Sequence, residues 1–208
     1  MSTKQKVIDA AISLFNTKGF QGTSVREVAK KADVNPALIS YYFGSKKGLL
    51  ESLLLQFYEP YLQMLEEAVN EMPKLTPAVC LKEMCARILA FQQQHVALTR
   101  FVYREMTLDS VLIREMMATY LKRETFFMKS VFQAGVQNQP FNHYSIDYAV
   151  IQFKGMVMMP YLYPQYLTEV LYIQPRETYF VRRYQERINR WIDSMQIFQT
   201  ETQTKKRA

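Results

Sequence analysis

Apolar residues recur every three or four positions through most of the chain, and no stretch shows the strict alternation typical of a β-strand. Because residues three and four apart share one face of an α-helix, this spacing predicts helices. The first helix is expected over 4–18, with a glycine at the next position, where helices commonly end. The apolar residues on its inner face are Val7, Ile8, Ala11, Leu14 and Phe15. The pattern therefore predicts an all-α protein.

The same spacing continues to the end of the chain. A long connecting helix is expected over 46–72, with Pro60 inside it, where a missing backbone hydrogen bond should bend it. Further helices are expected over 77–94, 96–106, 109–136, 144–160, 164–173 and 176–198. The chain should thus comprise an N-terminal three-helix domain (1–45), the connecting helix, a larger helical domain (73–200) and a disordered basic tail (201–208).

The stretch from 23 to 50 carries several helix start signals close together. Ser24 and Glu27 match the capping-box pattern, in which each side chain satisfies a free amide at the start of a helix. Asn35 is a typical N-cap, and Pro36 follows at the first helical position, where its missing amide proton costs nothing. Two short helices joined by a tight turn are therefore expected here.

The second of these short helices should expose an unusual set of side chains. Leu38, Ile39 and Phe43 can point inward, which leaves small and tyrosine side chains outside. These outward residues are Ala37, Ser40, Tyr41 and Tyr42. Lys46 and Lys47 follow in the first turn of the next helix, where the helix dipole favours anions and opposes them. A helix-turn-helix with lysines beside it is typical of DNA binding.

The distribution of charge agrees with this interpretation. The formal net charge of the 208 residues is +7. Residues 1–50 hold eight Lys and Arg against three Asp and Glu, so most of the excess lies on the segment expected to meet phosphates. A basic face that only promotes solubility is the alternative.

Several short motifs in the first fifty residues resemble the DNA-binding domain of the TetR family of bacterial regulators. They are AA at 10–11, LF at 14–15, KGF at 18–20, TS at 23–24, VA at 28–29, ADV at 32–34, YYFGSK at 41–46 and LL at 49–50. The resemblance implies a homodimeric, sequence-specific DNA-binding protein with a larger helical C-terminal domain for dimerisation and regulation.

The residue types suggest how double-stranded DNA would be held and read. Hydroxyl and cationic groups suit phosphates, whereas outward side chains of the second short helix suit base edges. The expected phosphate ligands are Thr23, Ser24, Tyr42 and Lys46, and Arg26 can reach a phosphate or a groove. The expected base-reading residues are Asn35, Ala37, Ser40 and Tyr41, with Pro36 starting the helix.

One short helix reads too few bases for useful specificity, so two copies should bind a palindromic operator with half-sites about 34–36 Å apart. Apolar stripes on the helix from 146 to 159 and on the last helix are candidates for the dimer interface. Their residues are Ile146, Val150, Phe153, Val157, Tyr184, Ile188, Trp191 and Met195. An ordinary core helix shows the same kind of stripe.

Two later segments, LTRFVYREMTLDSVLIREMM (98–117) and MVMMPYLYPQYLTEVLYIQP (156–175), resemble the RefZ-type branch of this family, from spore-forming bacteria. The resemblance implies binding to chromosomal motifs and modulation of septum placement at sporulation, with the division protein FtsZ as a partner. A protein-binding surface should carry charges, and Arg100, Arg104 and Glu105 are its expected contacts. The alternative is a solvated face with local ion pairs.

Other classes of function fit less well. The chain has two histidines and lacks the sequence motifs of serine hydrolases, P-loop enzymes, zinc proteases and dinucleotide-binding enzymes, so no enzyme, metal or cofactor is expected. An ordinary repressor released by a small-molecule ligand in the C-terminal domain remains the main alternative, because Met and aromatic residues can line a cavity. No apolar run is long enough to span a membrane, which favours a cytoplasmic, nucleoid-associated protein.

Overall fold

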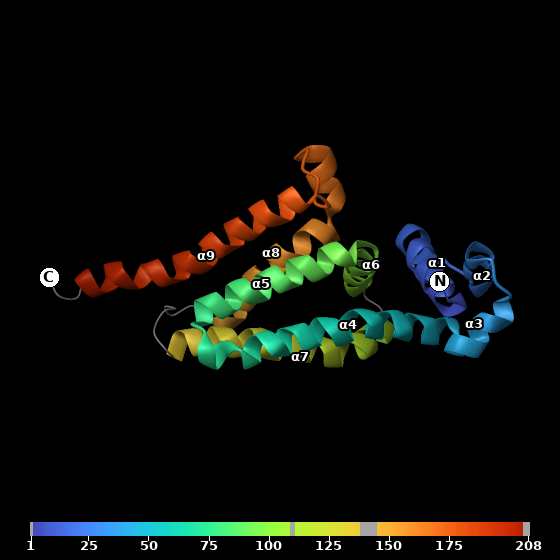
Figure 1. Ribbon diagram of the computed structural model, residues 1–208, viewed down its shortest axis with the longest axis horizontal. Coiled ribbons are helices and arrows are strands. Elements are labelled where there is room, and N and C mark those ends of the chain that lie inside the picture. Colours follow the sequence, from blue (N-terminus) through green and yellow to red (C-terminus); the bar gives the residue numbers. More distant parts are fainter. Residues whose placement is uncertain (1, 109–110, 138–144, 206–208) are drawn as a thin grey trace. The chain divides into compact units, whose positions relative to one another are not determined.

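The computed structural model describes residues 2–108, 111–137 and 145–205, and this part of the chain contains helices and no strand, as Figure 1 shows. The expected all-α fold is confirmed. The α-helices are α1 (Thr3–Lys18), α2 (Val25–Ala32), α3 (Pro36–Phe43), α4 (Lys46–Asn70), α5 (Pro77–Gln94), α6 (Val96–Met106), α7 (Val111–Gln137), α8 (Ile146–Leu162) and α9 (Thr178–Lys205). A short 3₁₀ helix, η1 (Met72–Lys74), and a π-helix, η2 (Tyr166–Val170), complete the set.

The helix bounds differ from the expectations at two places. The helix expected over 164–173 is reduced to η2, because Tyr172 adopts a left-handed backbone conformation (φ 55°) that ends it. The last helix continues to Lys205, although a disordered tail was expected from residue 201. Residues 201–205 include no glycine or proline, so nothing in this stretch stops the helix. Residues 206–208 lie outside the described part.

The chain forms two compact units. The first unit joins the residues up to Pro60 with those of 95–119, so α6 belongs to the unit that carries α1, α2 and α3. Its core contains a chain of aromatic contacts. The ring of Phe15 lies 5.4 Å from those of both Phe20 and Phe101, and Phe57 lies 5.9 Å from Tyr103. This packing joins α6 to the first helices.

Polar contacts reinforce the packing of α6 on α1. The side-chain amide of Asn16 donates to the carbonyl of Ala97 (2.8 Å), and the guanidinium of Arg104 donates to the carbonyl of Asn16 (2.8 Å). Glu105 is buried beside the backbone of Phe20, and burial raises the pKa of its carboxyl. The expectation that Glu105 faces a protein partner therefore needs correction, because Glu105 is only 1% exposed. Arg104 is exposed, with its guanidinium bound to the carbonyl of Asn16.

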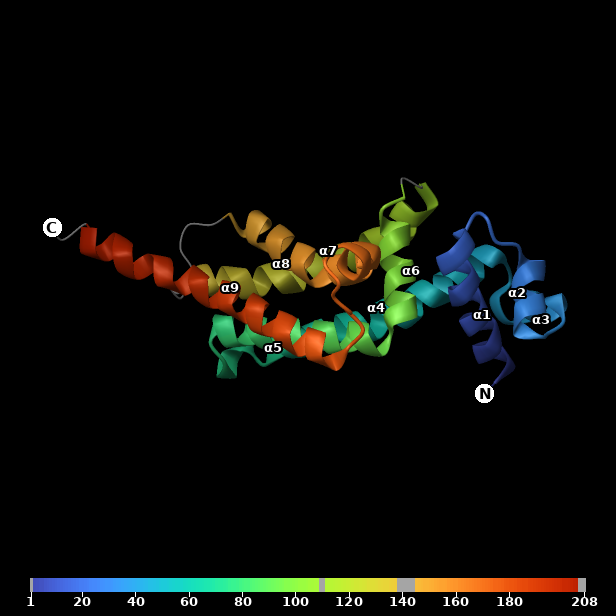
Figure 2. The same ribbon diagram turned by 90° about the horizontal axis from the view of Figure 1, so that it is seen from above.

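The second unit comprises 61–94 and the residues from 120 onward. Its α9 packs along α5, and α8 also contacts α5, an arrangement that can be followed in Figure 2. The Tyr184 hydroxyl donates to the carbonyl of Met156 (2.8 Å), which ties α9 to α8.

Most of the residues expected at a dimer interface lie inside this unit. Five of them are less than 9% exposed within the single chain: Val150, Phe153, Val157, Ile188 and Met195. Their stripe fills the core, so these side chains have no surface left for a second copy. Ile146, Tyr184 and Trp191 are half-buried.

Candidate nucleic-acid interface

The start of α2 is fixed by the capping box that the sequence predicted. The Ser24 hydroxyl oxygen accepts from the amide of Glu27 (3.2 Å), and the Glu27 carboxylate accepts from both the amide and the hydroxyl of Ser24 (2.8 Å each). The ammonium of Lys18 lies 2.6 Å from the same carboxylate. The hydrogen bond from Lys18, followed by those from Ser24, lowers the pKa of Glu27 to about 2. The carboxylate therefore stays charged and holds α2 against the end of α1.

The turn between α2 and α3 is also as expected. Asp33 takes the left-handed conformation (φ 54°), and its amide donates to the carbonyls of Ala29 and Lys30 at the end of α2. The side-chain oxygen of Asn35 then accepts from the amide of Ala37 (2.9 Å), with a proline at the first position of α3. These local bonds fix the direction in which α3 leaves the turn.

The junction between α3 and α4 is unusually tight. Gly44 ends α3 with φ 73°, a conformation that suits glycine, and the Ser45 hydroxyl accepts from the amide of Gly48 (3.0 Å). A Cβ atom on Gly48 would lie 2.0 Å from the carbonyl oxygen of Phe43. Glycine is therefore required there for α4 to begin so close to α3. Sequence reasoning overlooked Gly48, although a glycine in a first helical turn was a visible signal.

The outer face of α3 presents the residues expected to read bases. Ile39 points inward and is 1% exposed, whereas Tyr41 is 79% exposed. The other expected base-reading residues are exposed too: Asn35, Ala37 and Ser40. Pro36, which starts the helix, is also exposed. Tyr42 is 39% exposed, and its ring centroid lies 5.1 Å from that of Tyr41. The structure thus brings these side chains together on one solvent-facing helix.

The residues expected to bind phosphates differ in how far they are exposed to solvent. Ser24, the N-cap of α2, and Arg26, in the first turn of α2, are exposed. Thr23 is buried, and its hydroxyl donates to the carbonyl of Gly19 (2.9 Å). Thr23 therefore fixes the loop before α2, and its assignment as a phosphate ligand needs correction because its hydroxyl is not accessible.

Lys46 has contacts inside the unit. Its ammonium lies 4.4 Å from the ring centroid of Phe20 and 3.4 Å from the carbonyl of Gln21, and burial lowers its pKa. Lys47 is exposed and lies 3.9 Å from Glu51, one turn along α4. The first turn of α4 thus carries two cations, and only Lys47 is exposed.

Comparison with known proteins identifies the kind of protein that carries this surface. A family model described as bacterial regulatory proteins, tetR family, matches residues 7–53. Over 200 residues, the chain is 48% identical to the "Probable HTH-type transcriptional regulator YttP" of Bacillus subtilis (strain 168), and the match covers 96% of each chain. The chain belongs to the TetR family. This TetR-type protein is therefore a DNA-binding transcriptional regulator and not an enzyme.

Solved TetR-type structures share the fold over almost the whole chain. The transcriptional regulator FadR from Bacillus subtilis, in complex with stearoyl-CoA, has a TM-score of 0.72 at 18% identity and covers 91% of this chain and 97% of its own. AibR, in complex with isovaleryl coenzyme A and operator DNA, has a TM-score of 0.73 at 14% identity. The match covers 90% of this chain and 96% of the AibR chain. At such identities the likeness concerns the fold alone.

Two kinds of feature are absent from the described residues. No helix there is long and apolar enough to cross a membrane. No group of three or more His, Cys, Asp or Glu side chains in this part of the TetR-type chain is placed to hold a metal ion.

Gly48→Ala tests the junction of α3 and α4. The added methyl group must displace the backbone of Phe43, so we expect a loss of about 1–3 kcal/mol in the free energy of unfolding, as for other overpacked sites. DNA affinity should fall with it, because α3 changes direction. Urea unfolding and fluorescence anisotropy with labelled duplex DNA would measure the two effects. Gln56→Ala, on the exposed side of α4, is the control and should change stability by no more than about 0.5 kcal/mol. Equal results for both variants would contradict the role of Gly48.

Proposed function

We propose that this regulator binds a palindromic operator as a homodimer and reads it with α3. The observation that carries the proposal is the exposed row of Ala37, Ser40 and Tyr41 on a helix whose opposite side is anchored through Ile39. The major groove of B-DNA admits an α-helix, and small side chains allow the helix to approach base edges closely. Lys46 and Lys47, in the first turn of α4, would neutralise phosphates of the bound duplex.

A second copy is best accommodated by the outer face of α8. Tyr148 is 66% exposed, Ile151 64% and Leu162 37%, and their spacing places them along one side of the helix. Gly155 lies between them, and a Cβ atom added there would meet nothing within 4 Å. Glycine inside a helix is less stable than alanine by about 1 kcal/mol, and no contact within the described part of the chain accounts for it here. Close approach of another helix would account for it, so we assign this face, rather than the buried stripe, to the dimer.

A finer proposal concerns where the protein acts. The two segments that resemble the RefZ-type branch support a role at chromosomal sites near the division machinery, with FtsZ as a partner, in the cytoplasm at the nucleoid. Of the three residues expected to contact a partner, Arg100 is half-buried and Arg104 is exposed, although its guanidinium is bound to Asn16. The partner surface is therefore best sought elsewhere on the chain.

The second candidate function is that of a repressor released by a small molecule bound in the C-terminal domain. It is favoured by the solved structures of FadR with stearoyl-CoA and of AibR with isovaleryl coenzyme A and operator DNA, which share this fold. An acyl-coenzyme A or a related ligand would then control the affinity for DNA.

Substitutions on α3 and α4 test the DNA-reading surface. Lys46→Ala should weaken binding to selected operator and unrelated duplexes equally and reduce the salt slope by about one. Ser40→Ala should relax the preference at one base pair and leave non-specific binding unchanged. Anisotropy titrations at several salt concentrations, with operators selected from a random library, would measure both. Lys122→Ala, exposed on α7, is the control. An unchanged salt slope for Lys46→Ala, with the fold intact, would show that Lys46 does not contact phosphate.

Ile151→Arg tests the dimer interface. A buried unpaired charge should separate the copies, and operator affinity should fall because a monomer reaches one half-site. Sedimentation velocity would give the mass of the variant. Val79→Arg, at a 40% exposed apolar position on α5, is the matched control and should leave the dimer intact. A dimeric Ile151→Arg protein would exclude this face of α8 from the interface.

Mapping of bound sites across the chromosome, with division scored in a deletion strain, distinguishes the two finer roles. Several palindromic sites around the replication origin, together with misplaced septa, would support the division-related role. A single site beside a neighbouring transporter or enzyme gene, with normal division, would overturn it and favour the ligand-released repressor.

A further inference from the structure

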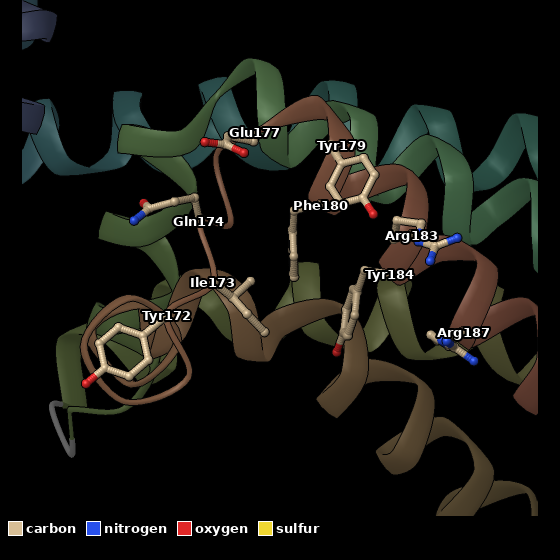
Figure 3. Close-up of a pocket in the computed structure, with 9 residues that line it drawn as sticks. All are labelled: Tyr172, Ile173, Gln174, Glu177, Tyr179, Phe180, Arg183, Tyr184 and Arg187. Carbon is tan, nitrogen blue, oxygen red and sulfur yellow. The ribbon is translucent and has the colours of Figure 1, made fainter.

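The second unit contains a surface pocket that the DNA-reading function does not use. It has a volume of about 440 Å³ and lies between the residues that follow η2 and the first half of α9. Figure 3 shows Ile173, Phe180 and Tyr184 around its centre and Arg183 and Arg187 together on one side. Pockets that bind small molecules usually measure roughly 300–1,000 Å³, so this one is large enough for a small ligand.

The apolar wall of the pocket is held in place before any ligand arrives. The rings of Phe180 and Tyr184 are stacked, with their centroids 5.1 Å apart and their planes at 16°. The Tyr184 hydroxyl is already bonded to the carbonyl of Met156, so this ring presents its face and not its polar end. At the start of α9, the side-chain amide of Gln93 donates to the carbonyl of Arg176 (3.4 Å). A flat ligand would thus meet a preformed surface.

The charged rim favours an anion. Arg183 and Arg187 are four residues apart on α9, so both guanidinium groups lie on the same face of the helix. The guanidinium of Arg183 lies 3.6 Å from the carboxylate of Glu186 and forms an ion pair with it. The same guanidinium lies 5.8 Å from the ring centroid of Tyr179. No carboxylate within the described part of the chain forms an ion pair with Arg187, which is exposed. Glu177, the one acidic residue among those lining the pocket, precedes α9 and lies ten residues from Arg187.

We propose that this pocket binds a small organic anion with a flat apolar body. The body would stack on Phe180 and Tyr184, and its carboxylate, sulfonate or phosphate would lie between Arg183 and Arg187, whose planar guanidinium groups suit such oxyanions. This site is additional to the surface that reads DNA and does not depend on it.

The full-length protein can be tested with two fluorescent probes of similar shape. One is 8-anilinonaphthalene-1-sulfonate, which is anionic, and the other is N-phenyl-1-naphthylamine, which is neutral. The single tryptophan, Trp191, lies one turn beyond Arg187 on α9, so energy transfer from it reports binding near the pocket. We expect saturable binding of both probes to the unmodified protein, with transfer from Trp191.

The double variant Arg183→Gln with Arg187→Gln should bind the anionic probe about tenfold or more weakly, which is the effect expected for a lost charge-assisted contact. Its affinity for the neutral probe should not change. The matched control is Arg182→Gln with Arg190→Gln, on the same helix but outside the pocket lining. Urea unfolding of both variants would check the fold. Anionic-probe binding that is equal in both variants would overturn the proposal. The proposal would also be overturned if the Ile151→Arg protein, expected to be monomeric, bound the probes and the unmodified protein did not. That result would mean that a second copy of the chain occupies the pocket in the dimer.

Discussion

The close approach of Gly48 to the carbonyl of Phe43 is the contact on which the exposed face of α3 depends. It allows α4 to begin with only two residues, Gly44 and Ser45, between it and the end of α3, and together these residues fix the angle between the two helices. The α3 helix is only eight residues long and buries one residue fully, Ile39, so it has little packing of its own. Its orientation therefore depends on its two ends as well as on Ile39, and Gly48 is the residue that permits the tight turn at the second end.

Local features of the fold were readable from the sequence because they depend on neighbouring residues. The capping box of Ser24 and Glu27, the Asn35 cap and most helix bounds follow from hydrogen bonds within a few positions. Burial was harder to predict. Periodicity shows that Phe153 and Ile188 lie on apolar faces but cannot show whether a face meets its own chain or another. The same limit applies to Glu105, whose charge suggested a surface and whose packing under α1 depends on residues some ninety positions away.

The core of the second unit contains a polar cluster that no short motif indicates. Glu124 is 3% exposed, accepts a hydrogen bond from the Tyr61 hydroxyl (2.8 Å) and pairs with Lys154. A buried carboxylate without partners would be strongly destabilising, so these three residues on α4, α7 and α8 are interdependent. Such a cluster does little for net stability compared with apolar side chains, but it disfavours other alignments of the three helices, in which the charge would be unpaired.

The connections between the two units explain why α4 and α7 matter for any regulation. The chain passes from one unit to the other at 60–61, 94–95 and 119–120, and the first and third of these crossings lie inside continuous helices. At the first crossing stands Pro60, which cannot donate the backbone hydrogen bond that an α-helix requires at that position. The helix is therefore least resistant to bending where it leaves the DNA-reading unit. Because α3 is joined to α4 by the short turn at Gly48, any bend of α4 at Pro60 bears directly on the segment that carries α3.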